Sequence, residues 1–272
     1  MFSRFIGGRS IASLSRRIKK LDYKPIIDYV GEHGNFIKEN KKCVSHFKNS
    51  FVSLKLTGLG LPNTDNAYNN CYKICSLAKN NNNKILIDAE NFKSKEQIDL
   101  ITDQLVKDFN KNSNILVYKT IQAYYKDSLK DLDNFLTKHN DNLGVKLVRG
   151  AYISEDSKYN VLCDSIEHTH FNYNKSIKVL SEYKKKNNTD VIIATHNSNS
   201  CLLGQEFDDI NNSNNRFKYA QLLGMADKLS RDLKNSGEDV YKYIPYGEYT
   251  KSIPYLTRRL IENYKIMQYL FT

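Results

Sequence analysis

The chain has 272 residues, of which 40% are hydrophobic and 26% are charged, and its formal net charge is +11. This composition is typical of one globular domain with a sizeable core, and no apolar run approaches the roughly 20 residues of a membrane-spanning helix, which excludes an integral membrane protein built from such helices. Five scattered cysteines argue against a secreted disulfide framework, and the absence of an RNA-recognition or zinc-finger signature predicts no nucleic-acid partner despite the basic charge.

Residues 1–24 carry six cations before the first acidic residue, Asp22, and serines lie among them. This pattern is typical of a mitochondrial transit peptide, and a basic helix of the mature protein is the alternative. We therefore set residues 1–24 apart from residues 25–272, for which one catalytic domain is predicted.

Short apolar or β-branched runs alternate with longer segments of helical period over the rest of the chain. Candidate strands are 25–30, 51–56, 84–89, 114–124, 145–151, 191–196, 216–223 and 240–246. Candidate helices are 64–79, 94–109, 126–139, 168–186, 225–235 and 250–270. This alternation predicts an α/β fold with parallel strands, and eight strands favour a closed (βα)8 barrel over an open doubly wound sheet. Few residues separate 31–34 from the second strand, so the first crossover helix is expected to be short or missing.

Polar residues follow nearly every predicted strand. In a parallel barrel the carboxyl ends of the strands meet at one rim, where such residues form an active site. The residues expected at this rim are Lys55, Asp88, Glu90, Gln122, Tyr124, Arg149, Tyr152, Thr195, His196, Asn197, Tyr243 and Tyr246.

Two other pairs of residues resemble metal ligands. Cys71 and Cys75 share a helix face but lack the further ligands of a zinc site, so they are predicted to be small core residues. His168 and His170 form an H-x-H pair that we predict to lie on the surface in a polar loop. No metal site is predicted.

Seven segments resemble the strand-end motifs of the proline dehydrogenases, flavoenzymes that oxidise L-proline to 1-pyrroline-5-carboxylate. They follow the family's order and are VSLKLTGLG (52–60), LIDAE (86–90), QAYYKD (122–127), KLVRGAYISE (146–155), ATHN (194–197), QLLGMAD (221–227) and the stretch 241–263. The resemblance implies a distorted (βα)8 TIM-like barrel with the last helix over its mouth. It also implies non-covalently bound FAD, L-proline as substrate, and ubiquinone or another membrane quinone as electron acceptor.

The resemblance assigns Arg258 and Arg259 to the substrate carboxylate, which a planar guanidinium fork can bind through two hydrogen bonds. These residues are about 100° apart on the predicted last helix, so they cannot both lie on its outward face with their apolar neighbours. Lys55 would add positive charge to the same carboxylate, and Asp88 and Glu262 would be the counter-ions of these three cations.

Tyr152, Leu222 and Tyr243 match the residues that wall the pyrroline ring in the family. A bulky phenol at Tyr243 would crowd a 4-hydroxyl group, which favours proline over hydroxyproline. The family's cofactor-binding positions correspond to Gln122, Lys146, Arg149, Ala151, Thr195, His196 and Glu262.

Three alternatives stay open on the sequence. The chain could be a hydroxyproline dehydrogenase of the same fold, a Schiff-base aldolase that uses Lys55, or a non-enzymatic barrel that binds anions or nucleic acid. The resemblance and the basic N-terminus predict a mitochondrial protein of the matrix, in peripheral contact with an anionic inner membrane, with the cytoplasm as the alternative location.

Overall fold

The computed structural model describes residues 4–31, 34–212, 214–248, 250 and 257. Apart from its residues 250 and 257, the helix expected over 250–270 lies outside the described residues. The same holds for Arg258, Arg259 and Glu262.

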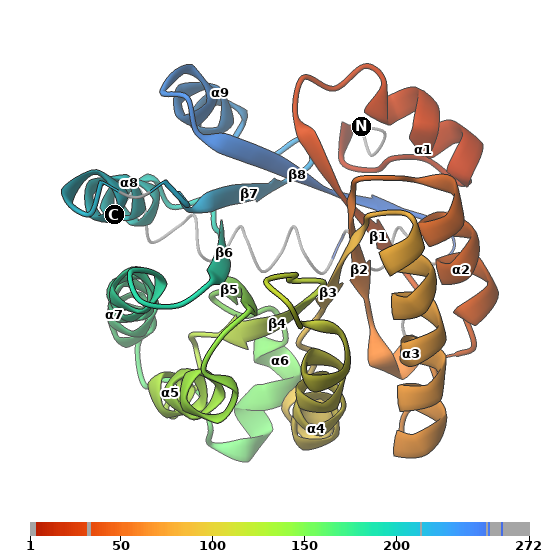
Figure 1. Cartoon of the computed structure of the whole chain (residues 1–272), viewed down its shortest axis with the longest axis horizontal. Helices are drawn as coiled ribbons and strands as arrows, with labels where there is room; N and C mark the ends of the chain where they lie inside the picture. The colour runs from red at the N-terminus through yellow and green to blue at the C-terminus, as the bar shows by residue number, and fades with distance from the viewer. Residues whose placement is uncertain (1–3, 32–33, 213, 249, 251–256, 258–272) are drawn as a thin grey trace.

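Eight parallel strands form the centre of the molecule (Figure 1). They are β1 (Lys24–Tyr29), β2 (Phe51–Leu54), β3 (Lys84–Ile87), β4 (Val117–Gln122), β5 (Leu143–Val148), β6 (Thr189–Ala194), β7 (Lys218–Leu222) and β8 (Asp239–Tyr246). Each strand pairs with the next, and β1 pairs with β8, so the sheet closes into a barrel in sequence order. All eight predicted strands and the predicted barrel are confirmed.

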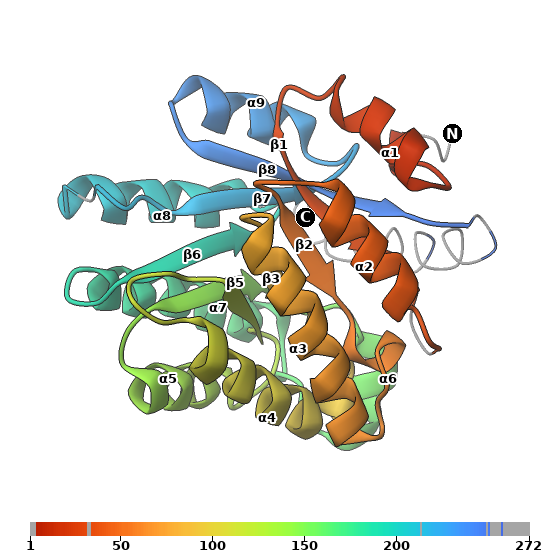
Figure 2. The same ribbon diagram turned by 45° about the vertical axis from the view of Figure 1, so that its right-hand side comes forward.

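Helices surround the strands, and Figure 2 shows α2 and α3 side by side on one flank. The described helices are α1 (Ile11–Ile18), α2 (Ile37–His46), α3 (Thr64–Asn80), α4 (Phe92–Phe109), α5 (Ser128–His139), α6 (Ile153–Asp156), α7 (Ile166–Lys184), α8 (Ser198–Ile210) and α9 (Asp227–Asn235), with short 3-10 turns η2 (Leu56–Gly58) and η3 (Ser157–Tyr159). None of these helices combines the length and the apolar character needed to cross a bilayer.

The five predicted helices in the described part are confirmed, whereas α2, the four-residue α6 and α8 were not among the candidate helices. The first crossover helix exists as the 10-residue α2, so a short helix was the correct alternative and a missing one was wrong. Helix α8 was not predicted, because its buried side carries Ser200, Cys201, Gly204 and Asp208 and has no repeat of large apolar residues. A Cβ atom at Gly204 would lie 2.6 Å from Ile193 Cδ1, so the helix packs close to β6 and a larger residue there would require neighbouring side chains to shift.

The basic N-terminal segment packs against the barrel. Leu14 of α1 is fully buried, and Ser10 caps the helix through a reciprocal pair of bonds with Ser13. The Gly7 amide donates to the Pro245 carbonyl at 2.8 Å, and the Gly247 amide donates to the Gly8 carbonyl at 3.0 Å. The basic N-terminal segment therefore forms an amphipathic helix, α1, and the residues before it are hydrogen-bonded to the end of β8.

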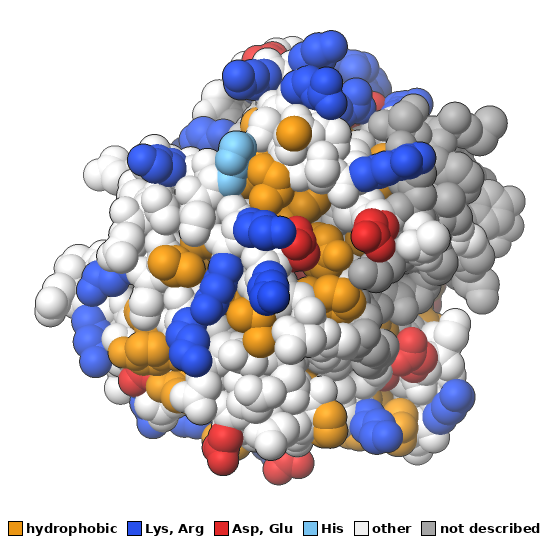
Figure 3. Space-filling model, turned by 90° about the vertical axis from the view of Figure 1, so that its right-hand side faces the viewer, with side chains coloured by type: hydrophobic (Ala, Val, Ile, Leu, Met, Phe, Trp, Pro, Cys, Tyr) orange, Lys and Arg blue, Asp and Glu red, His pale blue; other side chains and the backbone are white. Residues whose placement is uncertain are grey.

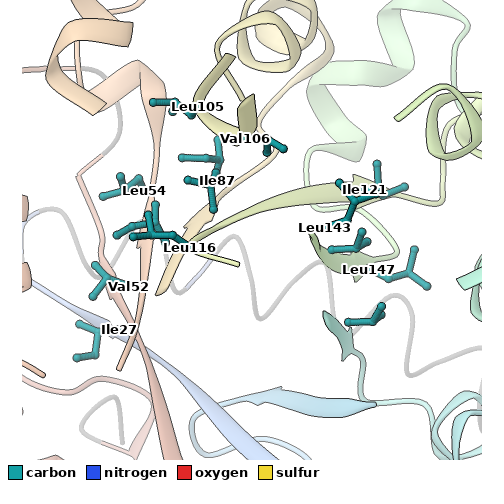
Figure 4. Close-up of a cluster of buried hydrophobic side chains, with 14 of the residues drawn as sticks. Ile27, Val52, Leu54, Ile87, Leu105, Val106, Leu116, Ile121, Leu143 and Leu147 are labelled. Atoms are coloured by element: carbon teal, nitrogen blue, oxygen red, sulfur yellow. The ribbon is translucent and has the colours of Figure 1, made fainter. Parts of the chain in front are cut away.

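The buried core has two layers separated by the strands. Inside the barrel, alternate residues of the strands meet, among them Ile26, Phe51, Leu86 and Tyr118. The strand residues between them point outward and pack against the helices. Figure 4 shows part of this outer layer, with Ile27, Val52, Leu54, Ile87, Ile121, Leu143 and Leu147 from the strands, Leu116 just before β4, and Leu105 and Val106 from α4. Because both faces of each strand are buried, the strands are continuous apolar runs in the sequence.

An ion-pair network joins α4, β4 and α5 on the outside of the barrel. Asp103 lies 3.2 Å from Lys119 Nζ, 2.7 Å from Lys138 Nζ and 3.5 Å from His139 Nε2. Burial alone would raise the pKa of Asp103, but the adjacent His139 ring and the two ammonium groups outweigh burial and hold this pKa below its usual range.

We expect the replacement Asp103→Asn to lower the free energy of unfolding at pH 7 by about 1 kcal/mol, after allowance for solvent screening. Because the folded-state pKa is depressed, the stabilisation is present above the unfolded-state pKa of about 4 and is lost as the pH falls below that value. Urea unfolding of the unaltered protein and of Asp103→Asn at pH 7 and pH 3 measures this difference in stability. The control is Asp133→Asn, because Asp133 is exposed. A difference as large at pH 3 as at pH 7 would contradict the electrostatic origin.

Candidate active site

The predicted polar rim lies at the carboxyl ends of the strands and faces the barrel axis. Successive side chains of a strand alternate between its two faces, so a residue two or four positions after an interior residue of the same strand also points to the barrel axis. Counted in this way from the interior residues of each strand, the residues at the rim are Asp28, Ser53, Lys55, Asp88, Thr120, Gln122, Ala194, Leu222 and Tyr243. Figure 3 views the side at which β8 ends, and acidic and basic side chains lie next to each other among hydrophobic ones near its centre.

Four charged residues, which we name the mouth cluster, alternate in sign across this rim: Asp28, Lys55, Asp88 and Lys146. Lys55 Nζ donates to Asp28 Oδ1 and lies 3.7 Å from Asp88 Oδ2. Lys146 Nζ donates to Asp88 Oδ1. All four residues are at most 7% exposed. Each charge therefore has an oppositely charged neighbour in a region that excludes most water, which is the condition for keeping buried charges ionised.

Asp88 is the centre of the mouth cluster. It accepts a hydrogen bond from Ser53 Oγ at 2.5 Å and one from the Tyr243 hydroxyl at 2.7 Å. Burial would raise the pKa of Asp88, but the ammonium groups of Lys146 and Lys55 and the hydrogen bonds from Lys146 and Ser53 hold it below the usual range. Asp88 is therefore ionised, and it fixes Tyr243, whose ring centroid lies 5.3 Å from Lys146 Nζ.

Asp28 was not among the residues that we predicted for the site. We expected Asp88 and Glu262 to offset the charge of Lys55, whereas the structure places Asp28 in direct contact with it, and Glu262 lies outside the described residues. Asp28 is fully buried in β1. A carboxylate within the otherwise apolar run PIIDYV was the available signal, because aspartate is almost never fully buried without a partner.

Gln122 belongs to a second group of buried polar residues beside the mouth cluster. Its side-chain amide donates to the Glu90 carbonyl at 3.0 Å and lies 3.4 Å from the Tyr125 hydroxyl. The Glu90 carboxylate accepts the Thr57 amide at 3.0 Å, and Asp156 accepts the Tyr125 hydroxyl at 2.7 Å. Glu90 and Asp156 thus hold together the ends of β2, β3 and β4, and they fix the position of Gln122.

Arg149 lies beyond the end of β5, and its partners come from later elements. Its guanidinium donates to Thr195 Oγ1 at 2.5 Å, to Ser200 Oγ at 2.9 Å and to His170 Nδ1 at 3.0 Å. The prediction that the H-x-H pair lies in a loop was wrong, because both histidines belong to the first turns of α7. His168 is exposed, as predicted for a surface residue, whereas His170 is half-buried against Arg149.

The remaining predicted residues stand at neighbouring strand ends. His196 Nε2 accepts the amide of Leu222 at 3.1 Å, which joins the ends of β6 and β7. Leu222 is paired in register with Tyr243. Tyr152 is buried just before α6, and Ala151 is half-buried. Cys71 and Cys75 are fully buried in the core, as predicted.

Comparisons with known proteins connect this geometry to a family. A family model described as "Proline dehydrogenase" matches residues 12–270. "Proline dehydrogenase 2, mitochondrial" of Arabidopsis thaliana is 38% identical over 219 residues, which cover 75% of this chain and 46% of the relative. "Hydroxyproline dehydrogenase" of Xenopus laevis is 33% identical over 219 residues, which cover 72% of this chain and 45% of the relative. The chain thus spans less than half the length of these relatives.

A solved structure shows the same fold. Proline utilization A from Bdellovibrio bacteriovorus, inactivated by N-propargylglycine, superposes with a TM-score of 0.85 at 19% identity, covering 96% of this chain and 32% of that one.

Proposed function

Since the chain belongs to the proline dehydrogenase family, we propose that it oxidises L-proline to 1-pyrroline-5-carboxylate, with FAD as hydride acceptor and a quinone as the subsequent electron acceptor. The observation that carries this proposal is the mouth cluster of Asp28, Lys55, Asp88 and Lys146, which stands beside Tyr243 at the carboxyl ends of the strands. Catalytic groups of (βα)8 enzymes occupy this end of the barrel.

The charge balance of the mouth cluster bears on how the substrate carboxylate binds. Two lysines and two aspartates sum to zero, so Lys55 and Asp88 provide a polar surface without excess positive charge. We therefore assign the additional charge that a carboxylate requires to Arg258 and Arg259, which lie outside the described residues. Tyr152, Leu222 and Tyr243 are the proposed apolar wall of the pyrroline ring.

The described residues fit an anionic dinucleotide cofactor. The Arg149 guanidinium hydrogen-bonds only to uncharged partners within the part of the chain that the structure describes, so its positive charge is not neutralised there. Gln122 and Lys146 are held in fixed positions nearer the axis. We propose that FAD binds through Gln122, Lys146, Arg149, Ala151, Thr195, His196 and Glu262.

FAD, when bound, would supply the hydride acceptor, because no amino-acid side chain can take a hydride. The chain's own residues orient proline and exclude water from its C5 atom. The amine must also lose a proton, and Asp88 is a poor acceptor because its pKa is held below the usual range. We assign this proton to solvent.

The visible absorption spectrum of the purified protein tests the proposal. We expect flavin bands that bleach when L-proline is added without oxygen. Flavin bands that proline leaves unchanged would contradict the substrate, and the absence of flavin after reconstitution with FAD would contradict the cofactor.

A Schiff-base aldolase is disfavoured by the surroundings of Lys55. Its Nζ contacts one carboxylate and lies 3.7 Å from another, and carboxylates stabilise an ammonium ion, whereas Schiff-base formation needs a neutral amine.

Tyr243 is the proposed determinant of the choice between proline and hydroxyproline. Its hydroxyl is fixed by Asp88, so the ring cannot move aside for a 4-hydroxyl group without breaking a hydrogen bond. We expect Tyr243→Ala to raise the ratio of kcat/KM for 4-hydroxyproline to that for proline by about tenfold or more. Tyr243→Phe keeps the bulk of the ring and should leave the ratio within about threefold, by the same reasoning. Equal ratios in all three proteins would contradict this role.

We also propose a mitochondrial location and peripheral contact with an anionic membrane, where the quinone would be met. Arg9, Arg16, Lys19 and Lys20 are exposed on or next to α1, and Figure 3 shows several Lys and Arg side chains close together at the upper edge of one face. We expect sedimentation with anionic vesicles at low salt and release at about 0.5 M salt, where charges are screened within a few ångströms. Binding that persists in high salt would contradict an electrostatic contact.

A further inference from the structure

Five residues around Arg149 form what we name the arginine cluster: Arg149, His170, Tyr173, Thr195 and Ser200. The three nitrogens of the guanidinium each donate one hydrogen bond, to His170, Thr195 and Ser200. Its Cζ atom lies 4.2 Å from the centroid of the buried Tyr173 ring. The partners come from α7, the end of β6 and the first turn of α8, so three elements fix the orientation of one side chain.

His170 makes the one hydrogen bond that the Arg149 Nε atom donates. A hydrogen bond from Nε of an arginine requires an acceptor, so His170 Nδ1 must be unprotonated and the proton of the neutral ring is on Nε2. Burial and the nearby guanidinium both lower the pKa of His170, which keeps the ring neutral. His170 therefore holds Arg149 without neutralising its charge, which a carboxylate at the same place would do.

We infer that His170 is a positioning residue of the cofactor site: by holding Arg149 Nε, it sets the guanidinium in place for the anionic flavin nucleotide. This inference rests on the proposed function, because the ligand of Arg149 is taken to be FAD. A side chain that is fixed before its ligand arrives loses less conformational entropy on binding, so the gain is expected in affinity for the nucleotide.

The helix offers a matched control for this inference. His168 is two residues from His170 on α7, is exposed, and is not within hydrogen-bond distance of Arg149. The replacement His168→Ala therefore removes the same chemical group from the same turn without touching the arginine cluster. The replacement His170→Asn is the conservative variant, because the Asn carbonyl oxygen can accept from Arg149 Nε near the position of the imidazole Nδ1.

The experiment measures the dissociation constant of FAD for the apoprotein of all 272 residues by quenching of flavin fluorescence. We expect His170→Ala to weaken FAD binding about five- to tenfold, an effect within the net contribution of one ordinary hydrogen bond. His170→Asn should restore affinity to within about twofold of the unaltered chain, and His168→Ala should leave it unchanged. In an Arg149→Met background, His170→Ala should have an effect of less than about twofold, because the residue through which it acts is gone.

Two outcomes overturn the inference. Equal effects of His170→Ala with and without Arg149 would show that His170 acts independently of the arginine, and no effect on FAD affinity would show that the hydrogen bond does not position it. Failure of the proposed function is distinguishable, because the unaltered chain would then bind no FAD. Thermal unfolding of each variant separates a loss of affinity from a loss of folded protein, and His170→Asn keeps the test valid if His170→Ala does not fold.

Discussion

Replacing Asp88 by alanine is expected to lower the free energy of unfolding at pH 7 by about 3–5 kcal/mol, the usual effect of removing one partner of a buried ion pair. Asp88 contacts Lys146 and lies 3.7 Å from Lys55, and both lysines are at most 5% exposed. Among the described residues, Asp88 is the one carboxylate within ion-pair distance of Lys146. Its loss would leave a buried ammonium group without compensation. Urea unfolding monitored by circular dichroism measures the effect.

A second replacement in the same pair is the control. The double variant Asp88→Ala/Lys146→Met removes both charges and should recover at least half of the lost stability, because an apolar pair of similar volume is often as stable as a buried ion pair. The pKa of Asp88 lies below its usual range, so the stabilisation is present above pH of about 4 and is lost as the pH falls below that value. Additive losses in the double variant would show that Asp88 stabilises the barrel by packing and not by charge.

Replacing Arg258 and Arg259 together by alanine is expected to abolish bleaching of the flavin by proline at substrate concentrations that bleach the unaltered protein. The mouth cluster has no excess positive charge, so these arginines are the proposed source of the charge that holds the substrate carboxylate. Losing a charged partner weakens binding by about 2–5 kcal/mol, and we expect the dissociation constant for proline to rise by about two to three orders of magnitude. Anaerobic titration with proline, followed by flavin absorbance, measures it.

The charge-conserving variant Arg258→Lys/Arg259→Lys separates charge from geometry. Lysine keeps the positive charge but lacks the planar fork, so a loss of about tenfold is expected, between the unaltered protein and the double alanine variant. Both variants should retain the visible spectrum of bound flavin. Undiminished bleaching in the alanine variant would contradict the assignment of these two residues to the substrate.

The number, order and type of the strands could be predicted from the sequence because each strand is a local feature. A strand buried on both faces appears as a continuous apolar run, as in VIIATH and KILIDA, and its boundaries follow from neighbouring loops rich in Asn and Gly. The rim residues could also be predicted from the sequence. The carboxyl ends of parallel strands lie at one end of a barrel, and the order of the motifs assigned each motif to the end of one strand.

Helix α8 and the role of His170 could not be predicted in this way. The packed side of α8 is formed by small and polar residues that fit against β6 because of close approach, and no periodicity marks such a surface. His170 appeared as half of an H-x-H pair, and its partner is 21 residues earlier in the chain, at the end of β5. A hydrogen bond between distant residues leaves no local pattern.

The sequence by itself determined the barrel, the family motifs and the set of residue types at the mouth, since these depend on local periodicity and chain order. The tertiary structure alone decided which charges are paired. Lys55 contacts Asp28 of β1, while Asp88 contacts Lys146 of β5 and Tyr243 of β8. The physical reason is that closing the barrel brings β1 beside β8 and points side chains from distant strands at one axis, and Coulomb attraction falls with distance in space regardless of separation along the chain.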